Sequence, residues 1–241
     1  MTRSWLPVLC ILSGREGGGG IRVKSIRKII HAIAGSQPDG AFPGKCDKEG
    51  LSWETDPFHV LISTVLSQRT KDENTSVASR RLFSRFDTPK ALANAPVDEI
   101  RSLIRPAGFP SAKSKAVKEI SRIIHEDYGG EVPSNMESLL ALPLVGRKTA
   151  NCVLVYGFDL DAIPVDTHVH RVSNRIGLVK TMNPEETERR LVQIVPRDLW
   201  KIVNTSFVAF GKTICKPIGP KCGECPVNKY CDYYSTVFWK K

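Results

Sequence analysis

Apolar residues recur at the helical period along most of the chain. Isoleucines at positions 26, 29, 30 and 33 follow the spacing i, i+3, i+4, i+7, and the segment from Phe58 to Leu66 extends the same kind of stripe. Similar stripes occupy residues 97–104, 117–124, 169–176, 191–195 and 199–210. No segment alternates with a period of two over the length of a strand, and proline or glycine separates many of the stripes. The pattern predicts an all-α protein.

Length and charge narrow the function class. The 241 residues, of which 41% are apolar, suffice for one large domain or two small ones. Lysine and arginine number 35 against 25 acidic residues, and the net charge of +10 indicates an anionic partner such as nucleic acid or a lipid surface. No apolar run approaches the roughly 20 residues that a helix needs to span a bilayer. We therefore exclude a membrane-spanning protein.

The first residues differ in composition from the rest. The apolar segment from Trp5 to Leu12 is short for a signal peptide, and a glycine run follows it in place of a cleavage site. We expect residues 1–23 to form a disordered extension and the protein to be intracellular, in the reducing cytoplasm. Seven cysteines in that compartment favour metal binding or catalysis over disulfides.

Four of these cysteines are close together near the C-terminus. The spacing C-x6-C-x2-C-x5-C connects Cys215, Cys222, Cys225 and Cys231. Four thiolates so close in sequence can surround one tetrahedral metal ion or bind the four corners of an iron–sulfur cubane. A zinc knuckle, or cysteines that never meet, remain alternatives. The remaining three fall outside the pattern, and we expect them to be structural or incidental: Cys10, Cys46 and Cys152.

The segment LLALPLVGRKTA, residues 139–150, predicts a helical hairpin. An apolar helix ends at Leu142, a tight turn covers residues 143–146, and a second helix begins at Arg147. The free N–H groups at the start of a helix can bind a phosphate. Lys148 lies in the first turn, where the helix dipole favours the uncharged amine that a nucleophile requires. A plain hairpin with a solvated lysine is the alternative.

The segment IPVDTH, residues 163–168, predicts a loop that leads into a helix. Asp166 is the expected N-cap of a helix over residues 167–176. A carboxylate fixed at a helix start and facing a cleft can also steer protons or stabilise a cation. Capping alone would equally explain an aspartate at this position.

Taken together and in this order, LPLVGRKTA, VDTH and the cysteine spacing resemble the endonuclease III family of base-excision DNA glycosylases. DPFHVLISTVLSQRTKDENT from Asp56 and EVPSNMESLLALP from Glu131 extend the resemblance to about residues 24–234. The resemblance implies a two-lobed helix-hairpin-helix glycosylase fold with a C-terminal iron–sulfur cluster loop. A six-helix domain would occupy residues 50–160. Residues 24–49 and 161–234 would form a discontinuous iron–sulfur domain, followed by a tail at 235–241.

The resemblance also implies an activity. The protein would be a monomeric, nucleoid-associated base-excision-repair enzyme that removes oxidised pyrimidines from damaged double-stranded DNA. As an abasic-site lyase it would then cut 3′ to the site by β-elimination. Lys148 would attack C1′ and form a Schiff base, and Asp166 would assist departure of the base and proton handling at the sugar. The four C-terminal cysteines would hold a 4Fe–4S cluster.

DNA contacts follow from the same resemblance. Arg69 and its neighbours would fill the gap left by an extruded nucleotide, Phe109 would lie in an opposing wedge loop, and the hairpin backbone and basic side chains would contact DNA. The complete set is Gln68, Arg69, Thr70, Phe109, Lys113, Val145, Gly146, Lys216 and Lys221. Two positions depart from the family pattern: Leu144 stands where glycine is usual, and Arg69 where glutamine or alanine is common.

Two other functions remain open. One is a glycosylase for mismatched or deaminated bases, which Lys148 disfavours because monofunctional relatives activate water and need no amine. The other is a non-catalytic DNA-binding iron–sulfur module, which the joint presence of Lys148 and Asp166 disfavours.

Overall fold

The structure is a computed structural model that describes residues 23–36 and 55–238. Every regular element in these ranges is helical and none is a strand, which confirms the all-α prediction. The expected disordered extension lies outside the described residues, apart from Val23 at the start of the first helix. None of the described helices is long and apolar enough to cross a bilayer.

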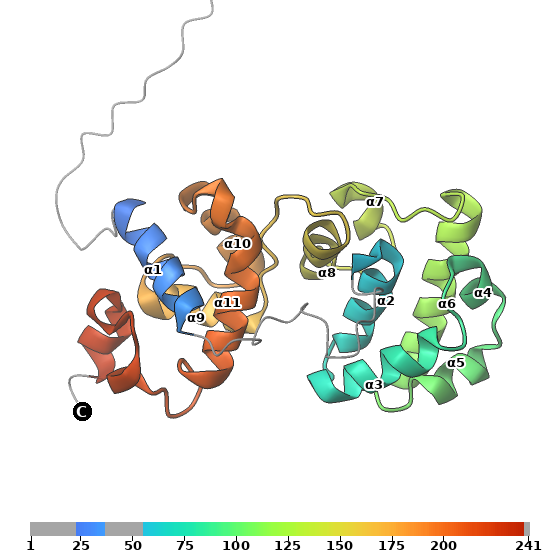
Figure 1. The fold of residues 1–241 in the computed structure, drawn as a ribbon, viewed down its shortest axis with the longest axis horizontal. Coiled ribbons are helices and arrows are strands. Elements are labelled where there is room, and N and C mark those ends of the chain that lie inside the picture. Colours follow the sequence, from blue (N-terminus) through green and yellow to red (C-terminus); the bar gives the residue numbers. More distant parts are fainter. Residues whose placement is uncertain (1–22, 37–54, 239–241) are drawn as a thin grey trace, which may run out of the picture.

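The helices follow the chain in the order shown in Figure 1. The α-helices are α1 (Val23–Gly35), α2 (Pro57–Ser67), α3 (Asp72–Phe83), α4 (Pro89–Asn94), α5 (Val97–Leu103), α6 (Pro110–Asp127), α7 (Met136–Leu140), α8 (Arg147–Cys152), α9 (Thr167–Ile176), α10 (Pro184–Ile194) and α11 (Trp200–Thr213). Shorter helical turns are η2 (Val153–Gly157), η3 (Arg197–Leu199), η4 (Cys222–Glu224), η5 (Asn228–Tyr230) and η6 (Tyr234–Phe238).

The first hydrophobic core is built around α2. Its buried residues run from Phe58 to Ala162, and α2 contacts α3, α6, α8 and η2. The helix is surrounded because it is apolar on more than one face, with Leu61, Ile62 and Leu66 completely buried. Its start is fixed by Asp56, whose side chain accepts a hydrogen bond from the backbone N–H of His59.

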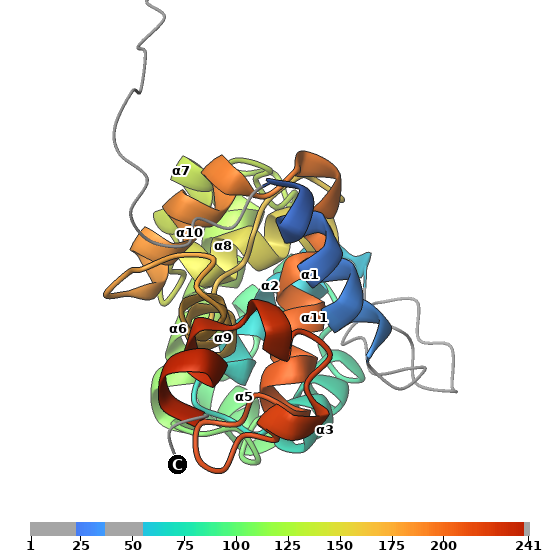
Figure 2. The same cartoon turned by 90° about the vertical axis from the view of Figure 1, so that its left-hand side faces the viewer.

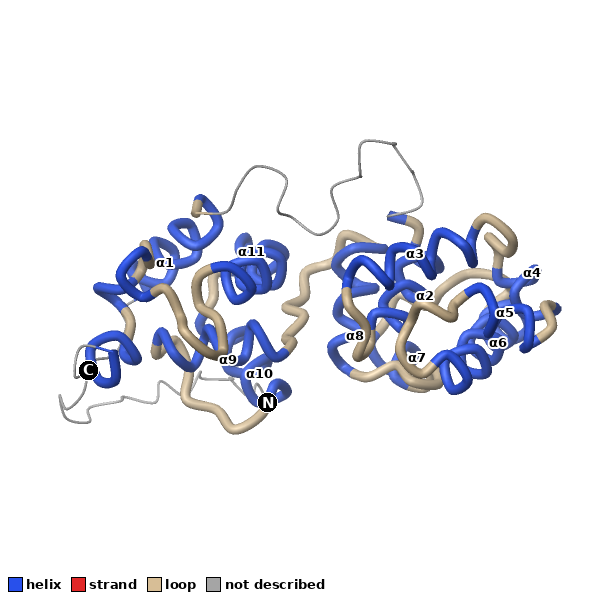
Figure 3. The backbone as a smooth tube through the Cα atoms, turned by 90° about the horizontal axis from the view of Figure 1, so that it is seen from below, coloured by secondary structure: helices blue, strands red, loops and turns tan. Residues whose placement is uncertain are grey.

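The second hydrophobic core joins the two ends of the chain. It combines the isoleucines of α1 with residues from Ile163 to Val227, and α11 contacts both α1 and α9. In Figures 1 and 3, α1 lies beside α9 and α11, away from α2, the next helix in sequence. Figure 2 shows this half end-on, with α1 and the chain after α11 towards the viewer. The chain passes from one core to the other between Ala162 and Ile163.

The hairpin lies at the edge of the first core. Helix α7 ends at Leu140, two residues before the predicted end, and α8 begins at Arg147 as predicted. Between them Leu144 has a φ of 57°, in the left-handed region that favours glycine. Helix α8 then continues into the π-helical turn η2. Gly157 at its end packs so closely on α2 that a Cβ would lie 2.9 Å from the Cα of Pro57.

Candidate active site

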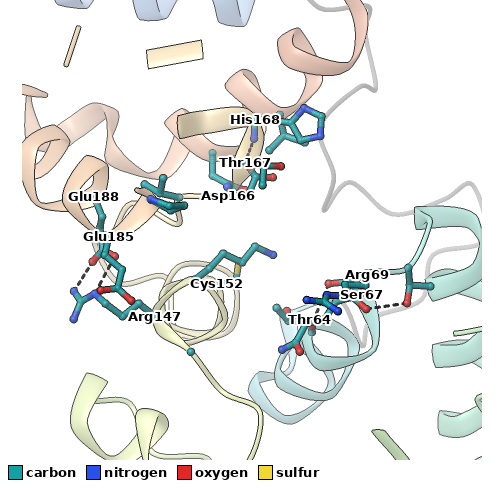
Figure 4. Close-up of a pocket in the computed structure, with 18 of the residues that line it drawn as sticks. Thr64, Ser67, Arg69, Arg147, Cys152, Asp166, Thr167, His168, Glu185 and Glu188 are labelled. Atoms are coloured by element: carbon teal, nitrogen blue, oxygen red, sulfur yellow. Dashed lines mark hydrogen bonds and ion pairs between the residues drawn. The ribbon is translucent and has the colours of Figure 1, made fainter. Parts of the chain in front are cut away.

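A cavity of about 980 Å³ is lined by residues of both cores (Figure 4). The end of α2 and the following turn form one wall, α8 and η2 form the floor, and α9, α10 and α11 close the other side. Lining residues include Gln68, Arg69, Thr70, Gly146, Arg147, Lys148, Cys152, Tyr156, Asp166, His168, Glu188, Asn204 and Lys212. The structure therefore brings Lys148 and Asp166 to one cavity, together with four of the residues predicted to contact DNA.

Asp166 caps α9 as the sequence predicts. One carboxylate oxygen, Oδ1, accepts hydrogen bonds from the backbone N–H groups of His168 and Val169, both at 2.8 Å. The other oxygen, Oδ2, has no hydrogen-bond donor within the described part of the chain, and the residue lines the cavity. The two interpretations of Asp166 are therefore compatible, because capping uses one oxygen and leaves the other for chemistry.

Cys152 lies one helical turn after Lys148 on α8, and its buried thiol also lines the cavity. Burial raises the pKa of the Cys152 thiol, while the Lys148 ammonium lowers it and the Asp166 carboxylate raises it. Both charged groups therefore act on the same sulfur. Cys152 was expected from the sequence to be structural or incidental. Only its i+4 spacing from Lys148 indicates that it lies in the site.

A chain of two hydrogen bonds supports the loop before Asp166. The hydroxyl of Tyr156, on η2, donates to Oδ1 of Asn204 on α11 at 2.9 Å. The side-chain amide of Asn204 donates in turn to the carbonyl of Pro164 at 2.8 Å. Burial raises the pKa of Tyr156 well above its usual range, so this hydroxyl remains a donor. No motif in the sequence marks Tyr156 or Asn204.

An ion pair ties α8 to α10. The guanidinium of Arg147 donates from Nε and Nη2 to the two carboxylate oxygens of Glu188, at 3.1 and 2.5 Å. Glu188 is buried, and its carboxylate raises the pKa of Arg147. Because Arg147 directly precedes Lys148, the pair fixes the start of α8 against the second core. Sequence reasoning missed this contact, since the partners are distant along the chain.

The predicted gap-filling residues lie on two neighbouring turns. The side chain of Gln68 donates to the carbonyl of Leu144 at 2.8 Å, which connects the turn after α2 to the hairpin. The next residue, Arg69, has a φ of 50°, and its guanidinium carbon lies 5.8 Å from the ring centroid of Phe109. Phe109 precedes α6, has a φ of 57°, and is 60% exposed. The pair is therefore displayed at the surface, with Arg69 at the cavity edge.

The burial of Lys113 contradicts its predicted contact with a DNA phosphate. Its side chain is almost fully buried, and the ammonium donates to the carbonyls of Leu66 and Gln68 and to the hydroxyl of Thr70. An ammonium with three internal acceptors has no proton left for a phosphate. Burial lowers the pKa of Lys113 to about 8. Sequence reasoning could not separate this lysine from the solvated ones around it.

The four C-terminal cysteines line one pocket beside Arg175. Burial, and to a smaller extent the neighbouring cysteines, raise the pKa of Cys225 to about 11. Nη1 of Arg175 lies 3.8 Å from the sulfur of Cys215, and the Cys231 thiol donates to the Arg175 carbonyl at 3.3 Å. Across the described ranges, no three histidine, cysteine or acidic residues form a group that could hold a single metal ion.

The remaining predicted contacts lie on the hairpin and the cysteine loop. Val145 is buried, while Gly146 caps α8 and lines the cavity. Lys216 is exposed, and Lys221 is 3.7 Å from a carboxylate oxygen of Glu224. Neither of these lysines lines the cavity of Lys148.

Known proteins match most of the chain. The family model described as HhH-GPD superfamily base excision DNA repair protein matches residues 62–197. The chain is 55% identical to endonuclease III of Thermotoga maritima over 181 residues, which cover 75% of this chain and 85% of the relative. A solved structure of a trapped endonuclease III–DNA covalent intermediate, in complex with an estranged adenine, superimposes with a TM-score of 0.79. It is 32% identical and covers 90% of this chain and 98% of its own.

A second solved structure is somewhat less similar. The structure of a thermostable thymine-DNA glycosylase superimposes with a TM-score of 0.74 at 28% identity, covering 87% of this chain and 94% of its own. Family model, relative and folds agree with the motifs that converge on the cavity. The chain belongs to the HhH-GPD superfamily of base excision DNA repair proteins and, within it, to the endonuclease III family.

Proposed function

We propose that Lys148 and Asp166 carry out the DNA glycosylase and abasic-site lyase reactions of this base excision repair enzyme. This assignment rests on one observation. Lys148, on α8 beside the first core, and Asp166, beside the second, line the same cavity, and only one carboxylate oxygen of Asp166 accepts hydrogen bonds among the described residues. No other lysine except Lys212 lines that cavity among the described residues. Nζ of Lys212 is already paired with Asp72.

The damaged nucleotide has to leave the duplex before it can react. A stacked base does not present C1′ of its sugar to a protein amine, so the nucleotide is flipped out at a cost of a few kcal/mol. The cavity volume lies near the upper end of the range of roughly 300–1,000 Å³ typical of small-molecule sites. A single nucleotide therefore fits between the two cores.

The free amine of Lys148 attacks C1′, and the bond from C1′ to the base breaks with its electron pair leaving on the base. The bound amine then loses one proton, and the C1′–O4′ bond breaks as O4′ is protonated, which leaves a protonated Schiff base, an iminium, between Nζ and C1′. The iminium acidifies the C2′ proton, and its removal expels the 3′ phosphate by β-elimination. One lysine thus serves both steps.

Asp166 handles protons in this scheme. Its Oδ1 is held by two backbone N–H groups, so the carboxylate keeps a fixed orientation at the cavity, and Oδ2 has no donor among the described residues. Such an oxygen can accept a proton from the Lys148 ammonium and thereby release the free amine. The same negative charge stabilises the cationic sugar as the base departs.

The DNA partner is a damaged duplex, bound by one copy of the chain. The backbone of Val145 and Gly146 at the start of α8 supplies a phosphate site, and Lys216 and Lys221 supply positive charge near the cysteine loop. Arg69 and Phe109 enter the space left by the flipped nucleotide, while Gln68 and Thr70 hold the turn that carries Arg69 against the DNA. Support comes from Gln68, Arg69, Thr70 and Gly146, which line the cavity, from Phe109 beside Arg69, and from the related DNA complex.

Oxidised pyrimidines are the proposed lesions. The likeness to a thymine-DNA glycosylase supports a second candidate, a glycosylase for mismatched bases. A panel of duplexes carrying oxidised, deaminated or mismatched bases separates the two, with strand cleavage measured before and after alkali. Cleavage of oxidised pyrimidines without alkali is the expected result. Alkali-dependent cleavage of mismatches would favour the second candidate.

We also propose that Cys215, Cys222, Cys225 and Cys231 hold the 4Fe–4S cluster that the family implies. Their chemistry fits, because four thiols line one pocket and a cubane needs one thiolate at each of four corners. The cluster would bind the cysteine loop to α9 and α11. Purified protein should be brown and contain iron; zinc alone would contradict this assignment.

Borohydride trapping tests the nucleophile. Reduction of the Schiff base should produce a covalent adduct between wild-type protein and abasic duplex DNA, and Lys148→Ala should yield none. Lys148→Gln should also fail, because an amide nitrogen has no available lone pair. Lys212→Ala, the matched change at the other cavity lysine, should retain the adduct. An adduct with Lys148→Ala would assign the attack to a different amine.

A further inference from the structure

A buried lysine connects the two turns that carry Arg69 and Phe109. Nζ of Lys113, on α6, donates to the carbonyls of Leu66 and Gln68 at 2.7 and 2.6 Å and to Oγ1 of Thr70 at 2.9 Å. The residue is only 3% exposed. The three protons of the ammonium therefore meet three acceptors, all of them at the end of α2 or in the turn that follows.

The second turn is attached to the same hydroxyl. The backbone N–H of Gly108 donates to Oγ1 of Thr70 at 3.0 Å. A Cβ on Gly108 would lie 2.7 Å from the carbonyl oxygen of Arg69, so the two turns are in direct contact. Phe109 follows as the N-cap of α6, and its carbonyl accepts a hydrogen bond from the backbone N–H of Lys113. The Thr70 hydroxyl therefore connects the first turn to both Gly108 and Lys113.

The backbone of these turns needs such support. Arg69 and Phe109 both have left-handed φ angles, of 50° and 57°, which side chains with a Cβ rarely adopt. Conformations of this kind persist only where surrounding contacts determine them. Lys113 bonds to the residues on both sides of Arg69, namely Gln68 and Thr70, and Thr70 in turn holds Gly108.

We infer that Lys113 is a positioning residue for DNA: its buried ammonium fixes the two turns as one unit and holds Arg69 and Phe109 ready to enter the gap left by a flipped nucleotide. The inference rests on the proposed function, because a flipped nucleotide creates that gap. Ordering the turns before DNA arrives removes an entropy cost that would otherwise be met on binding. Lys113 itself touches neither DNA nor the reacting atoms.

Lys113→Met tests this role, because methionine keeps a long flexible side chain and removes the charge and the three donors. Cleavage of an abasic site in duplex DNA should fall about tenfold or more, since small displacements of positioning groups are costly. Borohydride trapping on single-stranded abasic DNA should stay at the wild-type level, because a single strand has no gap to fill.

The matched control is Lys118→Met on the same helix. Nζ of Lys118 donates to the carbonyl of Ala95 at 2.7 Å and contacts neither turn. This variant should behave as wild type on both DNA substrates. Equal losses on duplex and single-stranded DNA with Lys113→Met, or no loss on either, would overturn the inference.

A milder variant guards against misfolding. Thr70→Val keeps the side-chain shape and removes the hydroxyl shared by Lys113 and Gly108. Amide hydrogen exchange at Gly108 should accelerate while the core amides of α2 remain protected, and the loss of activity should again be confined to duplex DNA. Unchanged exchange at Gly108 would contradict the inference independently of any catalytic assay. A wild-type protein that traps no abasic DNA would contradict the proposed function instead.

Discussion

A substitution of Asp166 can separate its role as a helix cap from its proposed role in proton transfer. Asparagine caps helices about as well as aspartate, so Asp166→Asn should keep the bonds to His168 and Val169 and leave stability nearly unchanged. Turnover should fall by a factor on the order of 10² or more, because a positioned proton acceptor is typically worth 10²–10⁴. Single-turnover cleavage and thermal unfolding, measured side by side, check both halves. An Asp166→Asn protein that cuts at full rate would reduce this residue to a cap.

The burial of Lys113 predicts how the unfolding free energy depends on pH. Its pKa in the folded protein is about 8, below the ordinary 10.5, because burial disfavours the charged form. Between these values the unfolded chain holds a proton that the folded chain has lost, so the contribution of Lys113 to stability rises with pH through this window. The gain is at most about 3 kcal/mol.

Urea unfolding at a series of pH values measures this effect. The difference in unfolding free energy between wild type and Lys113→Met should be constant below about pH 8 and should then increase towards pH 10.5. Lys118→Met serves as the reference for general alkaline effects. A difference that shrinks across this range would mean that the hydrogen bonds, and not burial, dominate the titration of Lys113.

At this scale, sequence reasoning identified residues whose role follows from local position. The cap by Asp166 was predictable because the cap and the loop before it are adjacent in sequence, and the place of Lys148 in the first turn of α8 because it follows Gly146 directly after Arg147, while their catalytic roles stay predictions. Lys113 was assigned wrongly because its burial depends on carbonyls some 45 residues away. Arg147 and Glu188 are 41 residues apart, and no local pattern announces their pairing.

Leu144 in the hairpin has a strained backbone conformation, and a glycine at this position would relieve the strain. Leu144 has a φ of 57° and is 48% exposed, so glycine there would lose little packing and would adopt the left-handed conformation freely. We expect Leu144→Gly to raise the unfolding free energy by about 0.5–1 kcal/mol, the relief of strain exceeding the added freedom of the unfolded chain. Thermal unfolding measures it.

Leu140 provides the matched comparison for that change. It is a leucine on α7 with a similar exposure of 38%, but its backbone is helical. Leu140→Gly should therefore lower stability by about 1 kcal/mol. If both glycine variants were destabilised alike, the conformation of Leu144 would not be strained.

Strong periodicity made whole helices predictable. The stripes of α1, α2, α6, α9 and α11 correspond to helices in the structure, and the predicted range of α9 is reproduced. Helix α3 was not marked, because only four of its twelve residues are buried and most of the others are charged or polar. The π-helical turn η2 was also invisible, since its apolar residues VLVYG would continue an α-helix equally well.

At the scale of the whole molecule, the positive charge should govern DNA affinity through counterion release. Lys216 is exposed beside the cysteine loop, so Lys216→Ala should make the slope of log affinity against log salt shallower by about one unit. Lys221 already lies near Glu224, and Lys221→Ala should change the slope less. Filter binding across a salt series measures both.

Lys90 is the control for a general charge effect. It lies exposed on α4, at the opposite end of the molecule from the cysteine loop in Figure 1. Lys90→Ala removes the same charge and should leave the slope unchanged. An equal effect from Lys90 and Lys216 would show that net charge acts without a defined contact.

The passage of the chain between the two cores also sets an order of events on the ribosome. Every buried residue of the first core has been synthesised once Ala162 is added, whereas the isoleucines of α1, made before all of them, wait for α11. Domains tend to fold as they emerge, N-terminal first. A nascent chain therefore carries Lys148 on a finished half without the half that holds Asp166 in place. With the proposed roles of Lys148 and Asp166, strand cleavage becomes possible only after the second core has been synthesised, as far as Val227.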